Sequence, residues 1–394
     1  MRSDELQVVA DENMPGVEAC WQALMPALPV RIRRLPGRQL SATDVADADV
    51  LLVRSVTRVD ASLLAGSRVR FVGTATIGTD HVDLAYCQAH GITVASAPGC
   101  NARAVAEWVL AVIVQLAAER DRSLDGRTLG IVGFGHVGQQ VATLMRPLGL
   151  RLIACDPAHA RELPGFPDVT LHALPDLLAA SDIVTLHTPL TRSGPHPTWR
   201  MIGDAALRRL RPGAWLINAG RGDAIAGEAL RHWLENENGP CVLDVWPEEP
   251  RLSPALVAHV RLGTPHVAGH SVEGKWRGTW QVVQAAAAHL GRSAPDGASL
   301  SAALPGHDGA SPLLPPATAG MSSIRRLAFL LGQVIDLVGD DVRLRDSVLT
   351  SDPVQAFDAL RKHYAARREF TSWTLTLAPD DPLRDVLIAL GFSC

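Results

Sequence analysis

The chain has 394 residues, of which 47% are hydrophobic and 20% are charged, and its formal net charge is −4. This length and balance predict two or three soluble globular domains, and the weak negative charge excludes a general attraction to nucleic acid or anionic membranes. An anionic small molecule would need a local cluster of arginine and lysine side chains.

Cysteine usage and the N-terminal residues favour a reducing, cytoplasmic location. The six cysteines are scattered without a C-x-x-C pair, which argues against a disulfide framework and against a bound metal such as zinc. The N-terminus lacks a signal-peptide core, and the most apolar run, 104–118, contains Glu107 and is too short to span a membrane.

Short β-branched runs alternate with polar or helical stretches in the first hundred residues. They predict four buried strands, at 6–10, 50–53, 69–74 and 92–95. This alternation is typical of an α/β fold with a mostly parallel sheet. A long apolar helix is expected over 101–120, with Asn101 as its N-cap.

A second α/β unit begins at Thr128. Its six predicted strands cover 128–133, 151–155, 183–187, 214–218, 241–245 and 260–264. Helical stretches such as 137–148 and 203–211 lie between them, and this order predicts a doubly wound, nucleotide-binding sheet. A further helix is expected over 271–290.

The composition changes after Gly291. Residues 291–320 are dominated by Gly, Ser, Ala and Pro, which indicates a linker or a long surface loop. Helical periodicity returns at 322–338, and the segments 369–377 and 386–394 complete a small α+β tail. No motif in this tail predicts chemistry.

A glycine-rich string between a predicted strand and a predicted helix indicates a dinucleotide site. It contains G-x-G-x-x-G at Gly133, Gly135 and Gly138, with His136 and Val137 between the last two. The glycines permit a tight turn, a close approach to a pyrophosphate and close packing of helix on strand.

An acidic residue after the next strand favours NAD over NADP. Asp156 has nearly the spacing expected of a carboxylate that binds the adenosine ribose, and it would repel a 2′-phosphate. Arg161, close by, could instead accept such a phosphate. A purely structural glycine turn, with Asp156 as a helix cap, is the alternative.

Three charged or titratable residues each follow a predicted strand of the second unit. They are Arg221 in INAGRG, Glu249 in DVWPEEP and His266 in TPHVAG. A histidine can take the proton of a secondary alcohol, a carboxylate can orient it, and an arginine fork can hold a substrate carboxylate. Each residue alone is more often an ordinary loop or surface group, and their common position at strand ends favours catalysis.

These strings resemble those of the D-isomer-specific 2-hydroxyacid dehydrogenases over about 128–287. The resemblance implies that Arg221 clamps the substrate, that Glu249 pairs with His266, and that His266 is the acid/base. It implies two Rossmann-like doubly wound domains around a cleft. The domains implied are a substrate-binding domain of 1–105 with part of 271–290, an NAD-binding domain of 106–270, a linker of 291–320 and a C-terminal domain of 321–394.

A closer resemblance is to the branch of this family that oxidises 4-phospho-D-erythronate in vitamin B6 biosynthesis. It rests on DENMP at 11–15, VRSVT at 53–57, FVGTAT at 71–76, GTDHVD at 78–83, APGCN at 97–101, EGK at 273–275 and RGT at 277–279. It implies dimerisation through 321–394. It also implies an NAD site lined by Asp156, Thr188, Ala219, Arg221, Asp244 and Gly269.

The same resemblance suggests how the two anionic ends of such a substrate are held. Backbone N–H groups of Gly99, Cys100 and Asn101 would help Arg221 with the carboxylate. Arg54, Ser55 and Thr76 are the candidates for the phosphate, followed by Lys275 and Arg277, for which a surface charge is an equal interpretation. His270 stands where the family has a substrate-contacting tyrosine, and it can still donate a hydrogen bond.

Two alternative functions stay open at this point. A dehydrogenase for D-3-phosphoglycerate or hydroxypyruvate would share the catalytic residues. A non-catalytic NAD-sensing protein would share the scaffold, although no basic patch or peptide-binding feature favours it.

Overall fold

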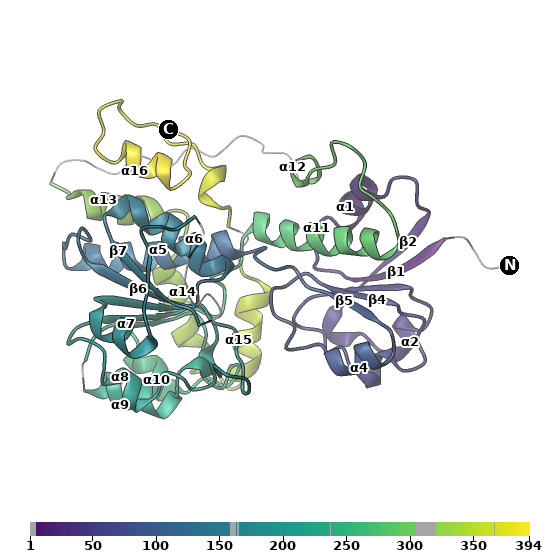
Figure 1. The fold of residues 1–394 in the computed structure, drawn as a ribbon, viewed down its shortest axis with the longest axis horizontal. Helices are drawn as coiled ribbons and strands as arrows, with labels where there is room; N and C mark the ends of the chain where they lie inside the picture. The colour runs from purple at the N-terminus through teal and green to yellow at the C-terminus, as the bar shows by residue number, and fades with distance from the viewer. Residues whose placement is uncertain (1–4, 158–162, 164, 237, 305–319, 366) are drawn as a thin grey trace. The chain divides into compact units, whose positions relative to one another are not determined.

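The computed structural model describes residues 5–157, 163, 165–236, 238–304, 320–365 and 367–394. The chain forms two compact units, Met1–Asn101 with Ser271–Asp308 and Ala102–His270 with Gly309–Cys394. Each unit has its own parallel sheet with helices on both faces (Figure 1). The α/β, doubly wound fold class is therefore confirmed. Half of the predicted linker, 305–319, and Arg161 lie outside the described residues.

The first unit is a five-stranded sheet in the order β2-β1-β3-β4-β5. Its strands are β1 (Leu6–Asp11), β2 (Val30–Leu35), β3 (Val50–Val53), β4 (Phe71–Thr74) and β5 (Thr93–Ala95). The sequence did not predict β2, because this edge strand alternates arginine with apolar residues and none of its residues is fully buried.

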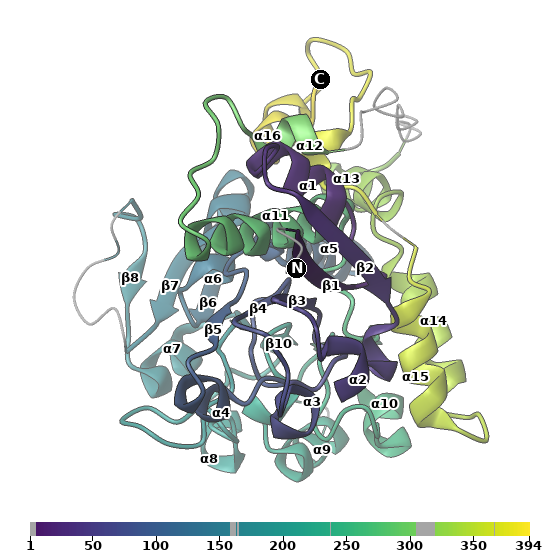
Figure 2. The same ribbon diagram turned by 90° about the vertical axis from the view of Figure 1, so that its right-hand side faces the viewer.

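Helices cover both faces of this sheet because successive strand residues point to opposite sides. Val8 and Ala10 of β1 belong to the core under α1 (Val17–Leu24) and α11 (Val272–His289), which lie on the same face (Figure 2). Val9 belongs to the opposite core. The remaining helical elements of this unit are η1 (Gly37–Gln39), α2 (Ala42–Val45), α3 (Ala61–Leu64), α4 (Leu84–Ala89) and α12 (Leu300–Ala303).

The second unit has a seven-stranded sheet in the order β12-β11-β10-β9-β6-β7-β8. Its strands are β6 (Thr128–Val132), β7 (Arg151–Cys155), β8 (Thr170–Leu171), β9 (Ile183–Leu186), β10 (Trp215–Asn218), β11 (Cys241–Leu243) and β12 (Leu262–Gly263). All are parallel, so their carboxyl ends meet at one edge. Six of them were predicted, and the two-residue β8 was not.

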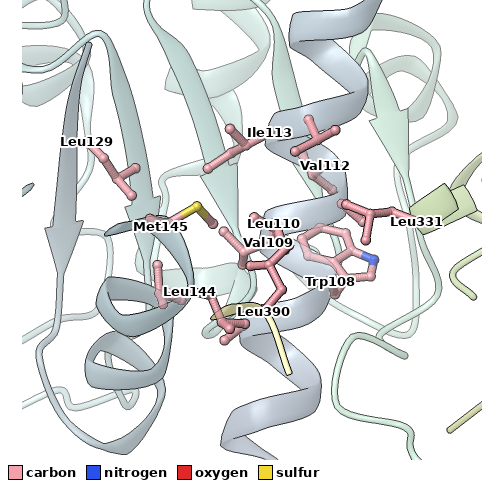
Figure 3. Close-up of a cluster of buried hydrophobic side chains, with 14 of the residues drawn as sticks. Trp108, Val109, Leu110, Val112, Ile113, Leu129, Leu144, Met145, Leu331 and Leu390 are labelled. Carbon is pink, nitrogen blue, oxygen red and sulfur yellow. The ribbon is translucent and has the colours of Figure 1, made fainter. Parts of the chain in front are cut away.

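One face of this sheet is covered by α5 (Ala102–Glu119) and α6 (His136–Met145). Figure 3 shows the core that they share, in which Trp108 of α5 lies among Leu144 of α6, Leu331 and Leu390. The other helical elements that belong to the sheet are η2 (Arg146–Leu148), α7 (Leu174–Ala180), α8 (Asp204–Leu207), η3 (Gly222–Ala224), α9 (Gly227–Glu235) and α10 (Pro254–His259). Asn101 was expected to cap the N-terminus of α5 with its side chain. Its Oδ1 is instead buried and accepts no hydrogen bond from the described residues, so this prediction is wrong.

The tail packs on the second unit. Its elements are α13 (Ser323–Gly332), α14 (Leu337–Ser347), α15 (Pro353–Lys362), η4 (Phe370–Ser372) and α16 (Arg384–Ala389). In the described part, the β pairing expected of this α+β tail is one β-bridge between Thr374 and Ser393. The predicted helix over 322–338 ends at Gly332, because Asp336 starts a new helix by accepting a hydrogen bond from Gly339 N. No helix in the described ranges is long and apolar enough to cross a membrane.

Candidate active site

The glycine string forms the turn between β6 and α6. Gly133 has φ +88°, a conformation that favours glycine. A Cβ on Gly138 would lie 2.2 Å from Gly133 O, so only glycine lets α6 begin this close to β6. A Cβ on Gly135 would meet no atom within 4 Å. The backbone there is open to a ligand, and His136 and Val137 form the first turn of α6 behind it.

Neighbouring strand ends supply further candidates for the dinucleotide. Asp156 follows β7 and accepts a hydrogen bond from Phe134 N at 2.8 Å, which ties it to the glycine turn. Thr188 follows β9, and its Oγ1 is buried without a partner among the described residues. The Thr188 hydroxyl and the open glycine backbone can donate hydrogen bonds, and the Asp156 carboxylate can accept them. A dinucleotide requires both kinds of group, so the residues fit NAD.

Arg221 lies just past β10, in a loop held by a buried asparagine. Asn218 accepts from Gly220 N at 3.0 Å and donates to Arg221 O at 2.9 Å. Ala219 packs against the core between them. A Cβ on Gly222 would lie 1.9 Å from Trp246 O, so this glycine lets the Arg221 loop touch the loop that carries Glu249.

His266 and Glu249 form the central pair of the site. His266 Nδ1 lies 2.5 Å from Glu249 Oε1, and Trp246 N donates to Glu249 Oε2 at 3.2 Å. Burial alone would raise the pKa of Glu249, but His266 and then the charge of Arg361 hold it below its usual value. A carboxylate that stays ionised fixes the ring orientation and stabilises the protonated imidazole.

The loop that carries His266 is held from beneath by Asp244, which is 2% exposed. Its carboxylate accepts from Thr264 Oγ1 at 2.6 Å, Val267 N at 2.7 Å and Ala268 N at 3.1 Å. Burial still raises the pKa of this carboxyl above its ordinary value. Trp246 joins the two loops by donating from Nε1 to Thr264 O at 2.9 Å.

The sequence reasoning missed the supporting roles of Asn218, Trp246 and Thr264. All three lie inside the motif strings, and Asn218 and Thr264 are fully buried polar residues. The sequence did contain a clue to these roles, because each residue carries a hydrogen-bonding group at or just after the end of a predicted strand. A buried group of this kind is costly unless it is paired, so a partner in a neighbouring loop could have been expected. Gly269 and His270 complete this loop, and the His270 ring lies edge-on to Tyr364 at 5.7 Å between centroids.

The predicted substrate residues of the first unit lie on three of its loops. Arg54 and the exposed Ser55 form a turn after β3, where Arg54 Nε donates to the buried Asp11 at 3.1 Å. Thr76 follows β4 and donates its hydroxyl proton to Gly78 O at 3.0 Å, which occupies its one donor. Ala97 N donates to Thr76 O at 2.9 Å and so ties the third loop to the second.

The third loop contains Gly99, Cys100 and Asn101. Gly99 has φ +73°, and Cys100 O accepts a hydrogen bond from Arg277 of α11. Lys275, two residues earlier in this helix, is half-buried, and its pKa is lowered by burial and then by the charge of Arg54. Lys275 is therefore partly removed from water and within reach of the charge of Arg54.

Comparisons with known proteins show which family the chain resembles. Residues 101–268 match the NAD binding domain of the D-isomer specific 2-hydroxyacid dehydrogenases, and 317–391 match a domain of unknown function, DUF3410. An erythronate-4-phosphate dehydrogenase of Azotobacter vinelandii is 45% identical over 395 residues, covering 98% of this chain and 99% of the relative. One of Pseudomonas aeruginosa is 45% identical over 391 residues, with the same coverage.

Solved structures share the fold over about three quarters of the chain. The TT0316 protein of Thermus thermophilus is 29% identical, with a TM-score of 0.60, covering 74% of this chain and 99% of that one. A D-lactate dehydrogenase of Aquifex aeolicus, solved with NAD and lactic acid, is 22% identical, with a TM-score of 0.61, covering 72% and 95%.

Proposed function

The chain belongs to the erythronate-4-phosphate dehydrogenase family, whose members are NAD-dependent oxidoreductases, and we propose that it oxidises 4-phospho-D-erythronate to (R)-3-hydroxy-2-oxo-4-phosphooxybutanoate. The reaction would serve pyridoxal phosphate (vitamin B6) biosynthesis. The observation that carries the proposal is the contact of 2.5 Å between His266 and Glu249 at the ends of the parallel strands.

His266 acts as the acid/base in this proposal. Because Nδ1 is held by Glu249, Nε2 is the nitrogen that takes the proton of the C2 hydroxyl. NAD, when bound, accepts the hydride that leaves C2. Glu249 then stabilises the imidazolium, and the proton returns through the same nitrogen when the 2-oxo acid is reduced.

Arg221 is the proposed clamp for the substrate carboxylate. Its planar guanidinium can donate two parallel hydrogen bonds, and the buried Asn218 fixes the backbone on which it stands. Its Nη1 donates to Gly220 O at 3.0 Å, which sets the direction of the side chain from the loop. This arrangement would leave His266 to carry the proton chemistry.

The phosphate is assigned to the cations of the first unit. Burial and then the charge of Arg54 lower the pKa of Lys275, and a bound dianion would stabilise both cations. Ser55 and the backbone of the loop at Gly99 are further donors. Thr76 becomes a weaker candidate, because its hydroxyl proton goes to Gly78 O.

We also propose that the tail makes the protein a homodimer. Five of the seven exposed large hydrophobic side chains among the described residues lie in the tail, namely Phe329, Val338, Val342, Leu349 and Ile388. Val338 and Val342 are four residues apart on α14 and share one face of that helix, and exposed apolar patches are typical of interaction surfaces. Light scattering should give the mass of a dimer, and Val338→Asp with Val342→Asp should give that of a monomer.

The deciding experiment measures NADH formation with 4-phospho-D-erythronate beside D-3-phosphoglycerate and D-erythronate. A 2-oxo acid should be added to reoxidise NADH that leaves slowly. We expect the highest kcat/KM with the four-carbon phosphate. A preference for D-3-phosphoglycerate would refute the assignment of 4-phospho-D-erythronate as the substrate. Binding of NADH without turnover of any 2-hydroxy acid would refute the proposed dehydrogenase activity.

Lys275→Met tests the phosphate assignment separately. It should raise KM for 4-phospho-D-erythronate by about 10-fold or more, which corresponds to roughly 1.4 kcal/mol. The KM for D-erythronate, which lacks the phosphate, should stay the same. An equal change for both substrates would place Lys275 outside the phosphate site.

A further inference from the structure

A short segment of the tail approaches the catalytic loop of the same unit. The tail segment 361–367 runs from the end of α15, which lies beside α14 (Figure 2), and its described residues include Arg361, Tyr364 and Arg367. The catalytic loop is defined here as 264–270, with His266 near its middle. Neither motif nor composition marks the tail segment in the sequence.

Arg367 is the principal contact. It is 8% exposed, and its Nη2 donates to Ala268 O at 2.7 Å and to Ala104 O at 2.6 Å. Its Nη1 lies 3.3 Å from Glu107 Oε2. One guanidinium therefore joins the catalytic loop to α5, and hydrogen bonds from a charged donor are stronger than neutral ones.

The other end of this connection is a buried carboxylate. Glu107 is 0% exposed and also accepts from Arg103 Nε at 2.8 Å and Phe370 N at 2.9 Å. These donors hold Glu107 from both α5 and the tail. Arg367 is thus anchored firmly enough to restrain the carbonyl that it binds.

The catalytic loop needs such restraint because its backbone is strained. His266 has φ +56°, a left-handed conformation that costs a non-glycine residue about 1–3 kcal/mol and persists only where its surroundings impose it. Asp244 binds the N–H groups of Val267 and Ala268, and Arg367 binds the carbonyl of Ala268. Together they hold both polar groups of the residue two positions after His266.

Two further residues of the tail segment act on the catalytic loop or on Glu249. The Tyr364 ring lies edge-on to His270, and its hydroxyl donates at 3.0 Å to Asp340 of α14, which is 1% exposed. The charge of Arg361 acts on Glu249, the partner of His266. The tail segment therefore contacts the catalytic loop at two points, and the charge of Arg361 acts on the carboxylate partner of His266.

We infer that Arg367 is a positioning residue for His266, and that the domain matched over 317–391 holds the catalytic loop in its working conformation. Arg367 touches no reacting atom in this role and acts through the backbone of Ala268. The inference rests on the proposed function only for the role of His266.

The test compares Arg367→Lys with Arg326→Lys. Arg326, on α13, is equally buried at 7% exposed, and it pairs with Asp381 of the tail at 2.5 Å, away from the catalytic loop. A lysine cannot reproduce the fork that reaches two carbonyls and a carboxylate. The comparison therefore separates loss of a buried tail arginine from loss of the contact to Ala268.

Five quantities are measured on the full chain: kcat, KM, NADH affinity, thermal stability, and hydrogen exchange of amides over 264–270. Arg367→Lys should lower kcat on the order of 10- to 100-fold with KM and NADH affinity little changed, since a 1 Å misplacement can cost about 10²-fold. Exchange at Val267 and Ala268 should speed up. Arg326→Lys should lower thermal stability but leave kcat and the exchange of this loop at parent values.

Unchanged kcat and exchange in Arg367→Lys would overturn the inference, as would equal losses in Arg326→Lys. If the parent protein turned over no 2-hydroxy acid, the proposed function would fail, and the exchange comparison would still decide the role of Arg367. If Arg367→Lys did not fold, Tyr364→Leu would decide. It should lower kcat and speed exchange near His270, and parent values would refute the tail's role.

Discussion

Two glycines of the dinucleotide turn have opposite surroundings, and alanine at each should separate folding from cofactor binding. A Cβ on Gly138 would lie 2.2 Å from Gly133 O and 3.2 Å from Ile131 Cγ2. A Cβ on Gly135 would meet no atom within 4 Å. The first substitution therefore perturbs the protein itself, and the second perturbs only what approaches from outside.

Gly138→Ala should destabilise the fold. An ordinary contact begins near 3.4 Å, so α6 has to move by roughly 1 Å away from a backbone carbonyl that cannot rotate aside. Overpacking of this kind costs about 1–3 kcal/mol. Each kcal/mol lowers Tm by about 2–4 °C in a unit of this size. NADH affinity should fall as well, because the start of α6 is displaced.

Gly135→Ala should leave stability within about 0.5 kcal/mol of the parent protein. Its φ of −74° and ψ of −155° are extended backbone, which an L-residue adopts. The new methyl would project into the open space where the pyrophosphate is proposed to lie. We expect NADH affinity to fall by about 10-fold or more, or at least roughly 1.4 kcal/mol.

Thermal unfolding without cofactor and titration of NADH fluorescence measure the two effects independently. The expected result is a lower Tm for Gly138→Ala alone and weaker NADH binding for both variants. The reasoning fails if Gly135→Ala binds NADH like the parent protein. It also fails if Gly135→Ala is destabilised as much as Gly138→Ala.

Four further predictions follow from the site. His266→Ala should lower kcat by about 10²- to 10⁴-fold while NADH still binds, as steady-state rates and NADH titration would show. Arg221→Lys should lower kcat/KM by at least about 10-fold, because an ammonium cannot form the bidentate pair; parent kinetics would exclude the clamp. Glu249→Gln should lower kcat by at least about 10-fold, because the neutral amide cannot stabilise the charge that His266 gains when it takes the substrate proton; the parent kcat would contradict the pair. Burial lowers the pKa of His187 from 6.5 to about 3, so the stability it contributes is present above pH 6.5 and falls by about 1.4 kcal/mol per pH unit below it; in denaturant titrations, His187→Gln should be less pH-dependent between pH 6.5 and 5.

The parts of the fold that could be predicted from sequence are those with local patterns. The strand that runs into Gly133 and the helix that follows Gly138 are adjacent in the chain, and the glycine spacing reports the turn between them. The ends of the tail helices were harder to predict. The helical spacing of apolar residues continues past Gly332, although the helix ends there and Asp336 caps the next one. The edge strand β2 was missed for the related reason that its arginines conceal a half-buried pattern.

The proposed catalytic residues could be predicted for a topological reason. Arg221, Glu249 and His266 each follow a strand, and parallel strands bring their carboxyl ends to one edge whatever lies between them. The chain order alone therefore predicted that these loops meet. The contact of 2.5 Å between His266 and Glu249, and the burial of Asp244 beneath them, required the structure.

The sequence by itself determined the doubly wound fold, the NAD-binding turn and the identities of the proposed catalytic residues, because each is written in short strings at strand ends. Only the tertiary structure decided that the charge of Arg54 acts on Lys275 and that Arg367 binds the carbonyl of Ala268. Arg367 and Ala268 are 99 residues apart, and no local period relates them. Long-range contacts of this kind depend on how whole elements pack, so only the folded chain reveals them.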